Sequence, residues 1–243
     1  MFKKLVISIA LGMFLSFAIF VSPLSRLTHT EAKAARATLI TDTVYLPIVV
    51  SPPKPPGVYL MNNHSYFVDS RYLYIVGEVH NTMSEPVRWV KVSVDLFDDE
   101  GRLVGTDFTF VSADKIPAGR KACFQLFLSE PPGWTNYQLS SAYRYLGEVV
   151  TGLTVFNDSG RIDGDGYQVI GQVRNDSGQR IEYVQPSVTL YNDVGTVIGC
   201  DYTYINLTHL DPGQVDSFST SFYGRGSYAD VARYQVLVDG SLK

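Results

Sequence analysis

The feature that most constrains this chain is a long stretch of sequence that occurs twice. Residues 58–124 align with residues 152–218 without a gap, at a constant separation of 94 residues, and 17 of the 67 aligned positions are identical. Both copies contain the same landmark, which reads DLFDDEGRLVGTD at Asp95–Asp107 and TLYNDVGTVIGCD at Thr189–Asp201. A repeat of this length can form a small domain, so the sequence predicts two tandem copies of one fold.

Within each copy the residue pattern is that of β-strands. Apolar and polar residues alternate strictly in Val90–Leu96, which is the period of a half-buried strand. Asp98–Gly101 and Asn192–Gly195 have the composition of hairpin turns, because glycine allows positive φ and Asn or Asp satisfies the local backbone. Short strands separated by turns predict an all-β protein with two tandem Ig-like β-sandwiches, one at 58–148 and one at 149–243.

The first 34 residues have the features of a signal peptide. Lys3 and Lys4 precede the uncharged apolar run Leu5–Val21, and Ala32–Ala34 is an A-x-A-like cleavage site. The alternative is an uncleaved anchor, because 17 apolar residues lie at the lower limit of a membrane-spanning helix. Residues 35–57 follow as a Pro-rich linker. The sequence therefore predicts export, to an extracellular or cell-surface location.

The net charge limits the partners that the protein can bind, and the two cysteines limit the disulfide bonds that it can form. The formal net charge of the chain is −4. The leader contributes four cationic residues and one Glu, so its removal leaves a net charge of about −7. An acidic surface argues against nucleic acid as a partner. Cys123 and Cys200 fall in different copies at positions that are not equivalent, which excludes a bridge within one sandwich. An interdomain bridge would need a particular docking, so we favour two buried thiols that act as small apolar residues.

Three further positions carry predictions about packing. Phe124 and Phe218 are identical in the two copies and follow the apolar face of their strands, so we expect them in the cores. Pro186 falls in the middle of a predicted strand, where proline demands an edge or a bulge.

The residues of the repeat resemble a known family. Val94–Asp98 (VDLFD) and Val188–Asn192 (VTLYN) are similar to the motif of the FxLYD domain, a small extracytoplasmic β-sandwich of bacteria. The resemblance covers both copies and departs from the motif, since both have Val where the family has Phe. It implies the fold and no established activity, and it transfers no catalytic residues.

Exposed aromatic residues give the best candidate for a binding face. Trp89 and Phe97 lie on the strand face opposite the apolar residues of Val90–Leu96, which are Val90, Val92, Val94 and Leu96. Tyr183 and Tyr191 occupy the equivalent positions in the second copy. Such a row would stack on sugar rings or on a partner protein. The alternative, which we favour, is that packing or the neighbouring domain covers these side chains.

Other site chemistry has less support in the sequence. Asp158, Asp163 and Asp165 in the stretch NDSGRIDGDG are candidate calcium ligands, but Asp beside Gly is also what a turn requires. The four histidines have no metal-ligand spacing, and no nucleophile–base motif occurs, so we expect no enzyme activity and no cofactor.

The function that the sequence favours is a non-enzymatic binding or structural module, secreted or at the cell surface, whose partner is a protein or a carbohydrate. The alternative is a membrane-anchored accessory or sensor ectodomain that contacts a protein partner. Contact with the membrane is expected only if the N-terminal segment is uncleaved.

Overall fold

The computed structural model describes residues 54–146, 148–225 and 228–242, and strands are the only regular elements there. All of the strand pairings in these ranges are antiparallel. In this part of the chain no helix is long and apolar enough to span a membrane. The predicted signal peptide, 1–34, and most of the predicted linker, 35–57, lie outside the described residues.

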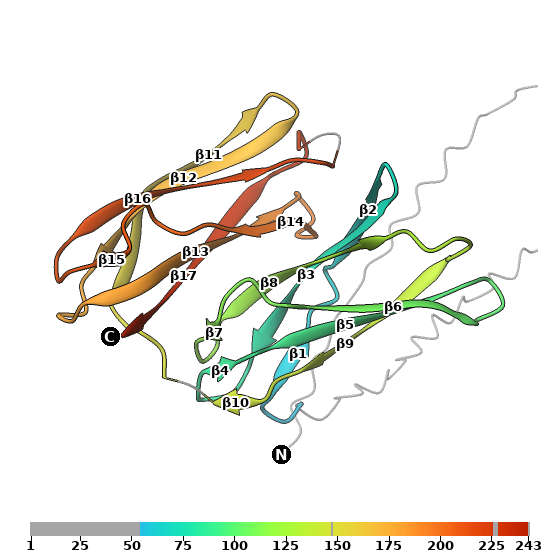
Figure 1. Ribbon diagram of the computed structural model, residues 1–243, viewed down its shortest axis with the longest axis horizontal. Helices are drawn as coiled ribbons and strands as arrows, with labels where there is room; N and C mark the ends of the chain where they lie inside the picture. The colour runs from blue at the N-terminus through green and yellow to red at the C-terminus, as the bar shows by residue number, and fades with distance from the viewer. Residues whose placement is uncertain (1–53, 147, 226–227, 243) are drawn as a thin grey trace, which may run out of the picture. The chain divides into compact units, whose positions relative to one another are not determined.

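The first sandwich has two sheets, with β3 and β5 as their central strands (Figure 1). In one sheet β3 pairs with β1 and β2 along one edge and with β8 along the other, and in the other sheet β5 lies between β6 and β9. The short strands β10, β4 and β7 form a further ladder. The strands are β1 (Val58–Leu60), β2 (Ser65–Asp69), β3 (Tyr72–Asn81), β4 (Val87–Arg88), β5 (Lys91–Phe97), β6 (Leu103–Phe110), β7 (Lys115–Ile116), β8 (Lys121–Ser129), β9 (Asn136–Ala142) and β10 (Tyr145–Leu146).

The second sandwich repeats this plan with fewer interruptions (Figure 1). One sheet has the order β11-β12-β16, and in the other β13 pairs with β14, β15 and β17. The strands are β11 (Leu153–Asp163), β12 (Gly166–Asn175), β13 (Ile181–Tyr191), β14 (Val197–Tyr202), β15 (His209–Leu210), β16 (Val215–Phe222) and β17 (Arg233–Leu242). The predicted fold, an all-β protein with two sandwiches from a duplication, is confirmed.

The cores follow from the alternation in the sequence. Val92, Val94 and Leu96 have no exposed surface, whereas Asp95 between them is exposed. Phe124 and Phe218 are buried in the two cores at 0% and 3% exposure, as predicted.

The repeated landmark is a hairpin in both copies. Gly101 and Gly195 have φ of 77° and 84°, a conformation that suits glycine. The Asp98 carboxylate accepts the backbone N–H groups of Glu100 and Arg102, and the Asn192 side chain accepts that of Thr196. The hydrogen bonds from Arg102 hold the pKa of Asp98 below its usual value. These polar residues therefore satisfy the turn backbone.

The two sandwiches contact each other through one sheet face of each. β2, β3 and β8 of the first lie against β14 of the second, and β8 also contacts β13. Val76, Tyr191 and Val197 form a buried apolar cluster in this contact, with Phe67 packed against it. The cluster is separate from both cores, so it is a third apolar interior that forms where the sandwiches meet.

A buried carboxylate lies at the centre of this interface. Glu78 has no exposed surface, and one of its oxygens accepts the hydroxyl of Tyr191 at 2.7 Å. The other oxygen accepts the ammonium of Lys121 at 2.6 Å and the amide of Asn63 at 2.9 Å. A buried charge is costly unless it is paired and hydrogen-bonded, and these three donors meet that requirement. Arg233 also covers the Tyr191 ring, at 3.7 Å from its centroid.

Backbone contacts and a disulfide complete the interface. The N–H of Val197 donates to the carbonyl of Asn63 at 2.7 Å, and the Ser65 hydroxyl donates to the carbonyl of Val197 at 2.6 Å. Cys123 on β8 is bonded to Cys200 on β14. A bridge across 77 residues of chain is worth about 4 kcal/mol in the chain-entropy description of disulfides.

Two sequence predictions need correction at this interface. Cys123 and Cys200 are not thiols but form a disulfide, because the docking of β8 on β14 brings two non-equivalent positions together. Tyr191, a candidate for the ligand face, does not belong to one: it is 1% exposed because the first sandwich covers the outer side of β13, which is the alternative favoured from the sequence. The sequence did not identify the disulfide, because neither sandwich alone contains this contact.

We expect Glu78→Gln to lower the free energy of unfolding at pH 7 by about 1–3 kcal/mol, because it weakens a buried charged hydrogen-bond network. Gln is the residue of the second copy at this position, Gln172. Burial alone would raise the pKa of Glu78, but the hydrogen bonds from Lys121, Tyr191 and Asn63 outweigh it and lower the pKa below 4.5. Its stabilisation is therefore present above pH 4.5 and is lost as the pH falls through the lower, folded-state pKa.

The measurement is urea unfolding at pH 7 and pH 3.5, with the exposed Glu100→Gln as the control. The difference between wild type and Glu78→Gln should shrink at the lower pH. An equal difference at both pH values, or none at pH 7, would contradict the role given to this carboxylate.

Candidate binding site

Each sandwich presents three exposed aromatic side chains at equivalent positions, which we call the first and second aromatic triads. All six are between 46% and 69% exposed, so they are not part of a core. The first triad consists of Trp89, Phe108 and Phe110, and the second consists of Tyr183, Tyr202 and Tyr204.

The strands explain why each triad shares a face. On β6, Phe108 and Phe110 point to the same side because strand side chains alternate. Their rings are edge-to-face at 6.2 Å, and Trp89 meets Phe110 in the same way at 5.9 Å. Tyr202 and Tyr204 repeat the edge-to-face contact at 6.1 Å. These are favourable arrangements for neighbouring rings, so the first triad, and the Tyr202–Tyr204 pair of the second, are pre-formed aromatic surfaces.

An unusual backbone conformation presents the first member of each triad. Trp89 and Tyr183 both have φ of 53°, in the left-handed region that bulky residues rarely adopt. Trp89 separates β4 from β5, and the pairing of β13 with β17 shifts register between Glu182 and Gln185. Pro186 itself pairs with Val238 in the regular part of β13, so the interruption predicted at the proline is not found there. A bulge such as that in β13 redirects a side chain, and in both copies the left-handed residue presents an exposed aromatic ring.

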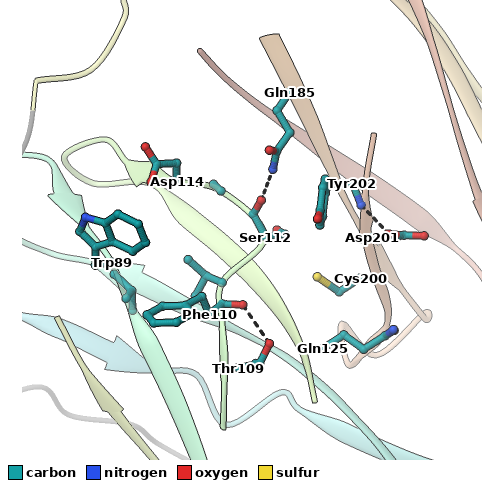
Figure 2. Close-up of a pocket in the computed structure, with 13 residues that line it drawn as sticks. Trp89, Thr109, Phe110, Ser112, Asp114, Gln125, Gln185, Cys200, Asp201 and Tyr202 are labelled. Carbon is teal, nitrogen blue, oxygen red and sulfur yellow. Dashed lines mark hydrogen bonds between the residues drawn. The ribbon is translucent and has the colours of Figure 1, made fainter. Parts of the chain in front are cut away.

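The two triads are joined by a groove between the sandwiches, which we call the aromatic groove. A hollow of about 470 Å³ is lined by Trp89 and Phe110 from the first sandwich and by Gln185 and Tyr202 from the second (Figure 2). On one side it shares Trp89 and Phe110 with a hollow of about 670 Å³ that includes Phe108. On the other side it shares Gln185 with a hollow of about 280 Å³ that includes the two remaining tyrosines. The two larger volumes are in the range of ligand sites, and the three hollows adjoin one another between the triads because they share lining residues.

Polar groups lie in the aromatic groove between the rings. Gln125, Thr109 and Asp201 line its middle part (Figure 2). Burial raises the pKa of Asp201, and its hydrogen bond from the backbone N–H of Tyr202 opposes that shift. This arrangement places aromatic rings on either side of amides, a hydroxyl and a carboxylate. It can bind a ligand that has an apolar face for the rings and hydroxyl groups at its edges for the polar side chains.

The interface holds the two sides of the groove together. The side chains of Gln185 and Ser187 both donate to the carbonyl of Ser112, across the two sandwiches (Figure 2 shows the first of these bonds). Cys200, bonded to Cys123, is also a lining residue. The shape of the groove therefore depends on the docking of the sandwiches.

The four aromatic residues that the sequence predicted for a binding face differ in their positions in the structure. Trp89 and Tyr183 are exposed and belong to the groove, whereas Phe97 is half-buried at the hairpin end of β5 and Tyr191 is buried in the interface. Sequence reasoning missed four residues, although the repeated pattern of aromatic, Thr, aromatic was a usable signal. They are Phe108, Phe110, Tyr202 and Tyr204.

The calcium candidates do not come together. In the ranges that the structure describes, no group of three or more His, Cys, Asp or Glu side chains is placed to hold a metal ion. Of Asp158, Asp163 and Asp165, the first accepts a hydrogen bond from the hydroxyl of Tyr234 at 2.7 Å.

Comparisons with known proteins give no family. No protein-family model matches the sequence, and no curated protein matches it. Among solved structures, red sea bream transglutaminase is similar over 75% of this chain, with 12% identity and a TM-score of 0.24, and the match spans 29% of that protein. The CBM22-1-CBM22-2 tandem domain from Paenibacillus barcinonensis Xyn10C is similar over 77% of this chain and 86% of its own length, with 11% identity and a TM-score of 0.17. Likenesses this distant carry no argument about function.

The left-handed backbone at Trp89 predicts an unusual order of stability between two variants. Because this conformation costs a residue with a Cβ about 1–2 kcal/mol, we expect Trp89→Gly to unfold with a free energy about 1 kcal/mol higher than Trp89→Ala. At Phe108, on a regular strand, the order should reverse, since glycine weakens a strand. Thermal or urea unfolding of the four variants checks this, and the same order at both positions would contradict the backbone conformation.

Proposed function

We propose that this protein is a non-enzymatic module that binds an extended carbohydrate chain in the aromatic groove. The observation that carries the proposal is the pair of equivalent aromatic triads with a series of adjoining hollows between them. A sugar ring has an apolar face of C–H groups and a hydroxylated edge, so aromatic rings with amides and hydroxyls between them suit it. Groups of exposed aromatic side chains also mark interaction sites in general.

The duplication supports a long ligand over a short one. Each triad is about half exposed and offers only a shallow surface, whereas the groove between them extends across both sandwiches. A chain of several sugar units that contacts both triads gains from each without a second loss of translational freedom. A monosaccharide contacts one triad and gains little.

The proposal includes a location outside the cytoplasm. The predicted signal peptide at 1–34 supports export, and the Cys123–Cys200 bridge is of a kind that persists in oxidising compartments. The FxLYD-like motif at Val94–Asp98 and Val188–Asn192 is compatible with this location, since the family it resembles is extracytoplasmic. We therefore place the protein in the medium or at the cell surface.

Binding to soluble polysaccharides tests the proposal, by affinity electrophoresis followed by calorimetry. The panel includes neutral chains (xylan, mannan, mixed-linkage glucan) and acidic chains (polygalacturonate, alginate). We expect Trp89→Ala and Tyr183→Ala each to weaken binding about 30-fold, the factor that corresponds to a loss of ~2 kcal/mol. The control is Tyr223→Ala, which removes an aromatic side chain that is 59% exposed and lies outside the groove.

Failure of every member of the panel to bind, or full affinity in the double variant Trp89→Ala/Tyr183→Ala, would contradict carbohydrate binding in the groove. In that case the alternative function, an ectodomain that contacts a protein partner, would be the better explanation of the exposed aromatic side chains.

A further inference from the structure

The two ends of the aromatic groove differ in charge. The hollow at the first triad is lined by two cationic residues, Lys91 and Arg144, and by no acidic residue. The ammonium of Lys91 lies 3.9 Å from the centroid of the Phe108 ring, which is a cation–π contact. Arg88 also lies over a ring of this triad, at 5.2 Å from Trp89, but Asp114 neutralises it at 3.0 Å.

The charge belongs to one copy only. Lys91 corresponds to Gln185 at the separation of 94, and Arg144 corresponds to Ser241 at the separation of 97 that follows the longer loop of the second copy. Arg88 corresponds to Glu182. The aromatic residues are thus present in both copies, whereas the free cations accompany only the first triad.

The two cations are available to a ligand. Neither Lys91 nor Arg144 forms an ion pair with a residue in the described ranges. The two acidic residues on β5 and β6 make hydrogen bonds to other groups: Asp95 accepts the hydroxyl of Thr106, and Asp107 accepts the backbone N–H of Phe108. An anionic ligand over this triad therefore meets two cations that no neighbouring carboxylate has neutralised.

We propose that the first triad binds an acidic sugar, a uronic acid or similar carboxylate-bearing residue, and that the second triad lacks this preference, because its hollow contains Asp114 and Asp239 and its one cation, Arg88, is paired with Asp114. This inference rests on the proposed function. The sugar ring stacks on the exposed faces of the first triad, and its carboxylate approaches Lys91 and Arg144. The preference for an acidic unit is confined to this end, because Asp114, Asp201 and Asp239 line the other two hollows.

The test compares polygalacturonate with its methyl-esterified form, which has the same backbone without the charge. We expect tighter binding of the acidic form at low salt and a decline in that preference as NaCl is raised, because exposed charges are screened. Lys91→Gln and Arg144→Ser give each position the residue of the second copy. Each should weaken binding of the acidic form about two- to fivefold, the effect of one exposed ion pair, and leave binding of the methyl ester unchanged. Arg120→Gln, exposed and outside the groove, is the control.

Each outcome decides between the two proposals. Equal affinity for the acidic and esterified forms, or no effect of the Lys91→Gln/Arg144→Ser double variant on acidic chains, would overturn the charge preference and leave carbohydrate binding intact. The absence of binding to any chain, acidic or neutral, would overturn both.

A parallel experiment measures binding to phosphatidylglycerol vesicles. If the protein binds the vesicles but no polysaccharide, and the Lys91→Gln/Arg144→Ser double variant loses this binding, the cationic end is assigned to an anionic membrane and the sugar assignment is overturned.

Discussion

The arrangement of this protein depends on a single carboxylate buried between two sandwiches. Glu78 faces away from its own core, and three donors from both sandwiches surround it. Its neighbour across the strand pair is Cys123, whose bond to Cys200 fixes β8 on β14. Tyr191 is the donor that comes from the second sandwich, so a displaced docking removes one of the three hydrogen bonds to Glu78, while those from Lys121 and Asn63 stay within the first sandwich. The aromatic groove then follows as a consequence, since its two sides belong to different sandwiches.

The duplication supplied the two sandwiches, and later divergence gave them different faces. The residues that make the interface have no functional equivalents in the other copy: Glu78 corresponds to Gln172 and Cys123 to Ser217. On the opposite side of the contact, Cys200 corresponds to Thr106 and Tyr191 to Phe97. Only one pair of faces therefore carries the buried charge and the bridge. The aromatic triads show the opposite behaviour, since all six positions kept an aromatic residue and both bulges kept their left-handed backbone.

Much of each sandwich could be predicted from the sequence, because local patterns determine it. The alternation in Val90–Leu96 placed the strand and its core face, and the glycines at Gly101 and Gly195 placed the hairpins. The candidate site was only half predictable. Trp89 and Tyr183 were candidates because of their phase on the strand, but the same phase applies to Tyr191, which the neighbouring sandwich covers. Periodicity reports which face of a strand a residue occupies, and it carries no information about what covers that face.

The interface could not be predicted from the sequence for a related reason. It joins residues of the two copies that are not at equivalent positions in the repeat. The most direct measurement is therefore peptide mapping of the native monomer without reduction. We expect one cross-linked peptide pair that contains Cys123 and Cys200, and no alkylation of either cysteine after denaturation without a reductant. Alkylation of both cysteines, or a cross-link found only between two molecules, would contradict the docking on which the aromatic groove depends.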